Sequence, residues 1–357
     1  MAATDVNLGC QVITYGDVEG TIRAAKRVEA AGFDILGVPD HLFHPSSSNQ
    51  FLTDPAWEAF SVLGAIARET DHVELWPTVT DSVRRHPTEL AHATATIDRL
   101  SDGRAGFGIG AGEAFNFDVI GDIDWSDPFT RFVETVTIVD GLWRSTPEDP
   151  LTFEGEFFQL ENADLGLKPV QQPRPPIWVG GYGPDMRGFT GAFADGWIPW
   201  VMTPEQYEQD LQRVLDVAAE RGRDPDEIDR AVMVPTNVGA DREEAREQGI
   251  ENNRATVALR PPLLARMGYE EIAAEAPLIR EMRFTPEQEQ QLLHAAEQIP
   301  ADAVDRAIIA GDAERAIERI ETFVDAGVDH LILVPIGDFD ETMTHFEETI
   351  IPYFQTA

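Results

Sequence analysis

A regular alternation of short apolar strands and amphipathic helices constrains this sequence more than any other feature. Residues 8–13, 33–38, 73–79 and 104–109 are apolar stretches of strand length, and each is followed by a segment in which apolar residues recur at helical spacing. Short connections separate these segments within the first 145 residues. Strands that alternate with helices in this way form parallel sheets covered by helices.

The second half of the chain repeats the alternation with two interruptions. Strands are predicted at 176–179, 196–200, 231–238 and 330–334, which brings the strand–helix units to eight. Residues 147–175, rich in proline, glutamate and phenylalanine, are one insertion with the character of a hairpin, and residues 241–300 are a second, mostly helical insertion. Eight units predict an α/β fold of the TIM (β/α)8 barrel type with insertions, in one domain over residues 1–357. A doubly wound open sheet is the alternative.

The charge of the chain narrows the choice of partners. The 64 acidic and 27 basic residues give a net charge of −37, and Lys26 and Lys168 are the only lysines. At molar salt the Debye length falls to about 3 Å, which screens the repulsion within such a chain. We therefore interpret the acidity as adaptation to a salt-rich cytoplasm, with a specific basic partner as the alternative. Nucleic acid and anionic membrane surfaces are unfavourable partners for this charge.

The sequence also argues against a disulfide, a metal centre and a membrane segment. The single cysteine, Cys10, allows neither an internal disulfide nor a thiolate cluster. His41 and His44 lie three residues apart, but no further histidine or cysteine group accompanies them. No apolar stretch reaches the ~18 residues of a membrane span, and no basic region followed by an apolar run marks a secretory signal. We expect a cytoplasmic protein without a metal.

The segment 101–113 carries the clearest sign of a functional site. A Ser-Asp-Gly turn leads into an apolar strand with the alternating glycines Gly108, Gly110 and Gly112, which Glu113 follows. Glycines allow a ligand to approach the backbone, and the active-site residues of TIM barrels follow the C-terminal ends of the strands. Glu113 is therefore a candidate general acid or base. The alternative is a glutamate in the first turn of a helix, favoured there by the helix dipole.

Polar residues and glycines follow the other predicted strands as well. Asp40 and His41 come directly after the second strand and are predicted to contact a ligand, the alternative being a helix cap and a surface imidazole. His44, three residues further on, is another candidate of this kind. The glycine-rich turn 180–183 opens a helix whose free N–H groups suit phosphate, unless the turn simply requires positive φ. The remaining residues at strand ends are Gln11, Thr78, Val79, Thr80 and Trp200.

Taken together, these segments resemble the luciferase-like oxidoreductases. The resemblance extends over residues 6–240 and returns at 327–334. Within that superfamily the segment 108–113, followed by Phe117 and Asp118, is most similar to the deazaflavin-dependent branch, especially the 5,10-methylenetetrahydromethanopterin reductases. The segments that carry the resemblance are residues 30–34 leading to Pro39-Asp40-His41, Arg85-His86-Pro87, 100–104, 108–113 and 177–181.

The resemblance implies a TIM barrel that binds coenzyme F420, an 8-hydroxy-5-deazaflavin, with FMN as the alternative cofactor. It also implies a non-proline cis peptide after the third strand, which falls at Thr78–Val79. Glu113 and Gln11 occupy the catalytic positions. The residues that the resemblance places at the cofactor are Asp40, His41, Thr78, Val79, Thr80, Gly112, Gly180, Gly181 and Gly183.

The implied reaction is hydride transfer from reduced F420 to a 5,10-methylene-tetrahydropterin, which gives the 5-methyl form. Glu113 would protonate N10 of the substrate and so open it to the N5 iminium. Gln11 stands where the methanogen reductases carry an acid, and Trp200 stands near a polar pterin-contacting position, so tetrahydrofolate is favoured over tetrahydromethanopterin. The alternatives are an FMN-dependent monooxygenase, an F420-dependent alcohol or sugar-phosphate dehydrogenase, and a catalytically silent flavin-binding protein. A homo-oligomer, either dimer or tetramer, is expected.

Overall fold

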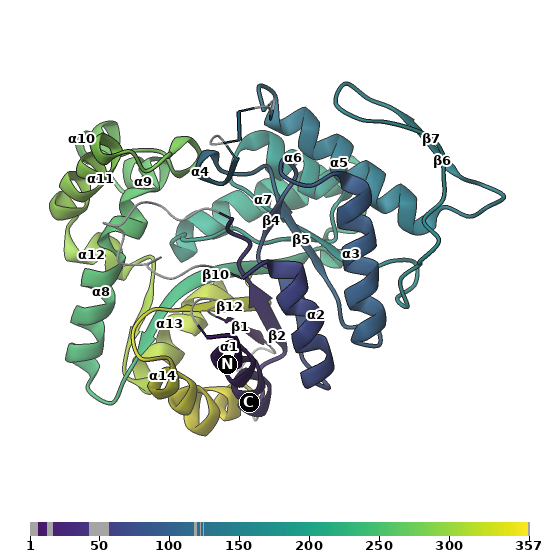
Figure 1. Ribbon diagram of the computed structural model, residues 1–357. Helices are drawn as coiled ribbons and strands as arrows, with labels where there is room; N and C mark the ends of the chain where they lie inside the picture. Colours follow the sequence, from purple (N-terminus) through teal and green to yellow (C-terminus); the bar gives the residue numbers. More distant parts are fainter. Residues whose placement is uncertain are drawn as a thin grey trace.

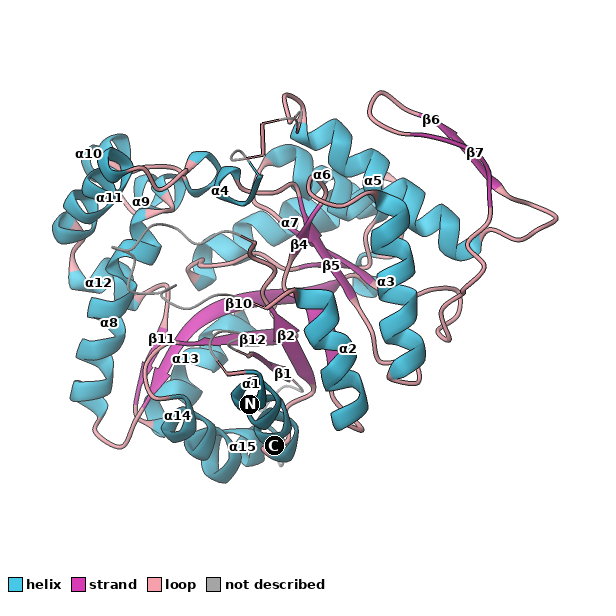
Figure 2. Ribbon diagram, in the orientation of Figure 1, coloured by secondary structure: helices cyan, strands magenta, loops and turns pink. Residues whose placement is uncertain are grey.

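The chain folds into a barrel of parallel strands with helices on its outside (Figures 1 and 2). This computed structural model describes residues 6–12, 17–42, 57–117, 120–121, 123 and 125–355. The order of the barrel strands in space follows their order in the sequence, and every pairing among them is parallel. The strands are β1 (Asn7–Gln11), β2 (Ile35–Val38), β3 (Glu74–Pro77) with β4 (Thr80–Asp81), β5 (Phe107–Gly110), β8 (Ile177–Gly180), β9 (Gly196–Trp197), β10 (Asp229–Val238) and β12 (His330–Pro335).

The barrel closes between its third and fourth strand positions. A parallel bridge joins Leu75 to Ala105, and the N–H of Gly106 donates to the carbonyl of Leu75 at 2.9 Å. On the other side, β1 pairs with both β2 and β12. A continuous ring of strands excludes the doubly wound open sheet and confirms the predicted TIM barrel.

Helices cover the outside of the barrel because they carry an apolar stripe, and all of the outer helices that begin after a strand, except α6, have a side-chain cap at their start. In α13 the buried residues Ala316, Ile320 and Phe323 lie on one helix face, and Asp312 caps the first turn by accepting the N–H of Arg315 at 2.9 Å. The outer helices are α1 (Val18–Ala30), α2 (Ala59–Glu69), α3 (Pro87–Leu100), α5 (Pro128–Arg144), α6 (Pro184–Phe193), α7 (Pro204–Glu220), α13 (Ala313–Asp325) and α14 (Phe339–His345). The last of these continues through η3 (Phe346–Ile350) into α15 (Ile351–Gln355).

Large aromatic side chains fill the interior of the barrel. Trp76 and Trp178 stack with their ring centroids 4.0 Å apart, and both are buried together with Ile35, Ile198 and Ile332. This packing explains part of the glycine pattern of segment 101–113. A Cβ at Gly106 would overlap the Trp76 ring, and one at Gly108 would overlap the carbonyl oxygen of Pro77. These two glycines therefore make room for protein atoms rather than for a ligand.

Two segments, 147–175 and 241–300, interrupt the alternation of barrel strands and outer helices. The first forms an antiparallel hairpin of β6 (Leu151–Glu154) and β7 (Gln159–Ala163), which extends away from the barrel (Figure 1). The buried carboxylate of Glu134 anchors it by accepting the N–H groups of Phe157 and Phe158, each at 3.0 Å. The second comprises α8 (Arg242–Ala258), α9 (Pro261–Arg266), α10 (Glu270–Glu275), η2 (Ile279–Glu281) and α11 (Pro286–Gln298), followed by α12 (Ala301–Asp305) and β11 (Ile309–Gly311).

Two predicted strands differ from the structure in detail, and one strand was missed. The strand predicted at 73–79 is interrupted at Thr78–Val79 and resumes as β4. The strand predicted at 196–200 ends at Trp197, because Pro199 has no N–H to donate to a ladder, and Trp200 forms only an isolated bridge to Met233. The short strand β11, which pairs with β10, was not predicted. Residue 13, the predicted end of the first strand, lies outside the described residues.

None of the helices in the described ranges is long and apolar enough to cross a membrane.

Candidate active site

The cis peptide implied by the family resemblance is present at Thr78–Val79, between β3 and β4. Gln11, at the end of β1, donates from Nε2 to the Thr78 carbonyl at 3.1 Å and to Thr78 Oγ1 at 3.0 Å. A Cβ at Gly180 would lie 3.1 Å from the Val79 side chain, so that glycine is needed for the close approach of β8. Gln11, Thr78, Val79 and Gly180 thus come together at the C-terminal rim of the barrel.

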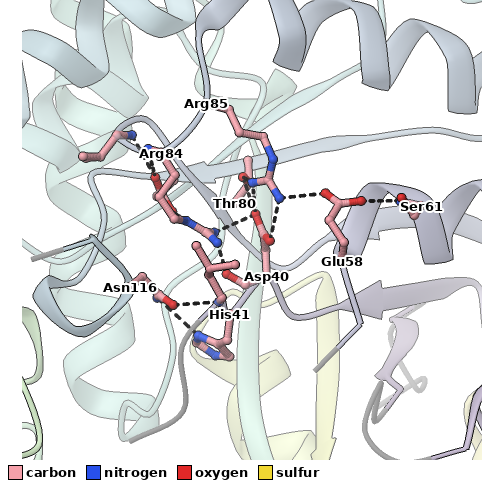
Figure 3. Close-up of polar contacts among 11 residues, drawn as sticks. Asp40, His41, Glu58, Ser61, Thr80, Arg84, Arg85 and Asn116 are labelled. Atoms are coloured by element: carbon pink, nitrogen blue, oxygen red, sulfur yellow. Dashed lines mark hydrogen bonds and ion pairs between the residues drawn. The ribbon is translucent and has the colours of Figure 1, made fainter. Parts of the chain in front are cut away.

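Asp40 is held at the same rim by three side chains (Figure 3). Thr80 Oγ1 donates to Oδ2 at 2.7 Å, Arg85 donates to both carboxylate oxygens at 2.5 and 3.1 Å, and Arg84 Nη2 lies 2.9 Å from Oδ2. The carboxylate side chain is only 2% exposed. Burial raises the pKa of Asp40, but the hydrogen bond from Arg85 and the charges of Arg84 and Arg85 outweigh it, and the pKa is lowered.

The two arginines connect Asp40 to further carboxylates. Arg84 donates from Nε to Asp81, and Arg85 donates from Nη2 to Glu58 at 2.7 Å. Arg84 also donates to the carbonyl oxygen of Asp40 at 2.7 Å. With its carboxylate enclosed by these partners, Asp40 fixes the backbone after β2, and the side chain that this backbone presents at the rim is that of His41.

His41 lies against the short helix α4 (Ala114–Phe117), which follows β5. Its ring packs at a tilt on Phe115 with the centroids 5.4 Å apart, and its Nδ1 lies 3.4 Å from Asn116 Nδ2. Asn116 in turn accepts the backbone N–H of Leu42 on Oδ1 at 3.0 Å (Figure 3). His44 falls among the residues that the structure does not describe.

Glu113 stands directly before α4, at the end of the glycine-rich strand. Its side chain is partly accessible, and among the described residues none donates a hydrogen bond to its carboxylate. Protein atoms nevertheless surround the group closely. Burial and the negative charge of Asp81 raise the pKa of Glu113 to about 7, against the opposing charge of Arg84. A carboxyl group with this pKa exchanges a proton near neutral pH, which is the property of a general acid or base.

Glycines shape the backbone on both sides of Glu113. Gly112 has a φ of 97°, and a Cβ there would lie 2.7 Å from the Phe117 ring. After β8, the turn through Gly180 and Gly181 ends at Gly183, the N-cap residue of α6, and no side chain caps this helix start. A Cβ at Gly183 would meet nothing within 4 Å. The N-terminus of α6 therefore offers uncapped N–H groups in open space, an arrangement that suits an anion.

A group that follows β8 was not predicted as part of the site. The Tyr182 hydroxyl donates to the carbonyl of Trp200 at 2.5 Å, and Arg260 lies over the Tyr182 ring with Cζ 3.2 Å from its centroid. Arg260 also donates to the carbonyl of Val201 at 3.0 Å and is 5% exposed. Burial raises the pKa of Tyr182, and the charge of Glu113 contributes to the rise, which places the phenol within electrostatic range of Glu113.

Sequence reasoning missed Arg84, Asn116, Tyr182 and Arg260. Arg84 and Asn116 lie within a few residues of predicted site residues, so their positions in the segments that follow β4 and β5 were the available signal. No sequence signal pointed to Arg260, because it comes from the second insertion and lies 60 residues along the chain from its hydrogen-bond partner Trp200.

The fold and the rim together define a TIM barrel whose C-terminal rim holds a carboxyl group with a pKa of about 7 between two glycine-rich segments. Residues 4–330 match the family described as luciferase-like monooxygenase. Because the match covers most of the chain, this protein belongs to the luciferase-like family, as the sequence motifs predicted.

Relatives in this family carry out different reactions. The chain is 30% identical over 286 residues to the phthiodiolone/phenolphthiodiolone dimycocerosates ketoreductase of Mycobacterium bovis, covering 79% of this chain and 74% of the relative. It is 30% identical over 330 residues to the 5,10-methylenetetrahydromethanopterin reductase of Archaeoglobus fulgidus, covering 92% and 93%. Among solved structures, an F420-dependent secondary alcohol dehydrogenase in complex with an F420–acetone adduct superposes with a TM-score of 0.81 at 25% identity, covering 98% and 99%.

Proposed function

We propose that this protein is an F420-dependent oxidoreductase that reduces a 5,10-methylene-tetrahydropterin to the 5-methyl form. When bound, coenzyme F420 supplies a hydride from its deazaflavin ring. The similarity to the reductase of Archaeoglobus fulgidus and to an F420-dependent structure supports the proposal. The observation that carries it is Glu113, a partly accessible carboxyl group with a pKa of about 7 on a glycine-lined rim.

The residues of the rim fit a flat ring system that bears a phosphate. The cis peptide presents the Thr78–Val79 backbone at the rim, and the neighbouring strands carry glycines, Gly110 and Gly180, where they face Val79. The uncapped N-terminus of α6 lies at the end of β8. We assign the deazaflavin ring to the Thr78–Val79 segment and the phosphate to the turn that ends at Gly183.

Glu113 would donate the proton that opens the substrate. An ordinary glutamate has a pKa of about 4.3 and is almost fully ionised at neutral pH, whereas Glu113, with a pKa of about 7, keeps its proton in about half of the molecules. Asp81 is tied to Arg84, and Gln11 is neutral and bonded to Thr78, so neither competes for this role. Protonation of N10 by Glu113 would precede hydride addition at the methylene carbon.

We further propose tetrahydrofolate as the carrier. Trp200 stands near a position where the methanogen reductases resembled by this chain have a polar residue. Its carbonyl is bonded to Tyr182 and Arg260, so the Trp200 backbone is fixed by both the barrel and the second insertion. A changed pterin wall beside an unchanged cofactor segment is the expected signature of a different pterin.

Reduction of a ketone, or its reverse, is the second candidate. His41 and Glu113 flank the same short helix α4, so the rim holds an imidazole and a protonated carboxyl group near one another. A carbonyl substrate needs one hydrogen-bond donor at its oxygen and one proton source, which these two groups can supply. The ketoreductase relative and the alcohol dehydrogenase structure support this candidate.

The test is anaerobic reoxidation of reduced F420 at molar KCl. The substrates are methylene-tetrahydrofolate, methylene-tetrahydromethanopterin and acetone, and a separate titration measures F420 binding. We expect reoxidation with methylene-tetrahydrofolate. Reoxidation with acetone alone would favour the second candidate, oxygen uptake with reduced FMN would favour a monooxygenase, and binding without any turnover would indicate a silent flavin-binding protein.

A further inference from the structure

The backbone of Leu42 determines which way the Asn116 amide points. A backbone N–H can only donate, so the Asn116 atom 3.0 Å from the Leu42 nitrogen must be the oxygen Oδ1. The amide nitrogen Nδ2 therefore faces His41, 3.4 Å from Nδ1 (Figure 3). Asn116 is 4% exposed, so its amide is held in this orientation by protein groups.

This orientation in turn decides where His41 carries its proton. An amide NH2 can only donate, so Nδ1 of His41 must accept and carry no hydrogen. A neutral imidazole then has its proton on Nε2. Both the other tautomer and the doubly protonated imidazolium would set an N–H on Nδ1 against the N–H groups of Asn116.

The ring itself is fixed by packing from two elements. Phe115 of α4 lies against the His41 ring, and Phe284 of the second insertion packs edge-on against Phe115 with the centroids 5.3 Å apart. The insertion therefore supports the position of His41 through one intervening side chain. The Asn116 amide determines which ring nitrogen of His41 carries the proton, while the aromatic contacts fix the plane of the ring.

The charged groups nearby agree with a neutral His41. On the His41 backbone itself, Asp40 has its carboxylate engaged by Arg84 and Arg85. Arg84, from the β4–α3 connection, donates to the Asp40 carbonyl and opposes a second positive charge beside it. Glu113, which directly precedes α4, retains its proton to about pH 7.

We propose that Asn116 is a positioning residue that holds His41 in the neutral form with its proton on Nε2. In that form His41 can donate a hydrogen bond from Nε2 but cannot take up a proton there. If the proposed hydride transfer is correct, on which this last step rests, Glu113 is left as the proton-exchanging side chain at this rim.

The direct test is nitrogen-15 NMR of the histidine rings in the full-length protein at high salt, with His41→Gln used to assign the signals. We expect a bare Nδ1 and a protonated Nε2 that do not titrate between about pH 6 and 8. In Asn116→Asp, the carboxylate can accept from both Leu42 and a protonated Nδ1, so the titration midpoint of His41 should rise by about 1–3 pH units. Asn253→Asp, a buried amide change in α8, is the matched control and should leave His41 unchanged.

A protonated Nδ1 in the unaltered protein would overturn the proposal, whether or not Asn116→Asp folds. So would an unshifted midpoint in a folded Asn116→Asp protein. A further readout is the pH profile of kcat/KM, in which Asn116→Asp should add a second titration that Asn253→Asp does not. Because the NMR spectra need neither cofactor nor substrate, failure of F420 turnover with the expected tautomer would contradict the proposed function alone.

Discussion

Glu113→Gln keeps the shape of the side chain and removes the proton that the proposed reaction needs. General acid catalysis typically contributes about 10²–10⁴-fold to a rate, which corresponds to about 3–5 kcal/mol of barrier. We expect kcat to fall by that factor. The affinity for F420 should change little, because the cis segment at Thr78–Val79 and the turn that ends at Gly183 are untouched.

The pH dependence of Glu113 gives two independent checks of the same reasoning. Burial and Asp81 raise its pKa from 4.5 to about 7. Since an acid must be protonated to act, kcat/KM of the unaltered protein should fall as pH rises through about 7. The unfolded chain ionises near the ordinary value, so the stability that the neutral group contributes is present at low pH and lost between 4.5 and about 7. Above this window Glu113→Gln should melt at a higher temperature than the unaltered protein, and below it the two should converge.

The assay is single-turnover reoxidation of reduced F420 in molar KCl, recorded beside thermal melts over the same pH range. Glu161→Gln, the same change at an exposed position of the hairpin, is the control and should alter neither. Near-normal turnover in Glu113→Gln, with an unchanged pH profile, would remove Glu113 from the chemistry. A collapse of F420 affinity alone would show that it binds the cofactor instead.

Three further predictions concern the cofactor, the Asp40 network and salt. A side chain at position 183 has room, because a Cβ there would meet no atom within 4 Å. In a fluorescence titration, Gly183→Asp should weaken F420 binding strongly because it places a carboxylate at the start of α6, whereas Gly183→Asn should not. Equal losses of affinity in both variants would exclude an electrostatic cause. Asp40→Asn leaves Arg84 and Arg85 without their shared partner and should cost about 3–5 kcal/mol in chemical denaturation. Because the pKa of Asp40 is lowered, this difference should be full above its ordinary value of 3.8 and disappear as the pH falls through the folded value. The melting temperature should rise from low to molar KCl because of the −37 net charge, and a midpoint independent of salt would contradict the interpretation.

The barrel could be predicted because its signal is local and repeated. Each strand is a short apolar run, most outer helices have a capping residue and an apolar stripe, and eight repetitions leave few alternatives to a closed ring. The ends of the elements were harder to place. Pro199 shortens the sixth strand through a missing N–H, and β11 is three residues long and is defined by its pairing with β10 rather than by its own pattern.

The site could be predicted in part for the same reason. Residues at the C-terminal ends of strands are brought to one rim by the fold, so the location of Gln11, His41, Thr78 and Glu113 at this rim followed from their positions in the sequence. The sequence does not show which side chains pair with one another at this rim. Asp40 was predicted to contact a ligand, but two arginines from a later loop enclose its carboxylate, and nothing in the pattern around Asp40 indicates them.

The contribution of the second insertion was beyond sequence reasoning. Arg260 and Phe284 reach Tyr182 and Phe115 across long separations in the chain, in a stretch whose helices have no regular relation to the barrel units. Such contacts depend on how α9 and α11 dock near α4 (Figure 1), and docking is decided by tertiary packing.

The central claim is that this protein moves a hydride from reduced F420 to a methylene-tetrahydropterin. The most direct measurement uses F420 reduced with deuterium at the transferred position, mixed anaerobically with the protein and methylene-tetrahydrofolate in molar KCl, followed by mass spectrometry of the pterin product. We predict a 5-methyl product that carries one deuterium, formed in step with F420 oxidation and lost in Glu113→Gln. A methyl product without deuterium, or F420 oxidation without any methyl product, would contradict the account.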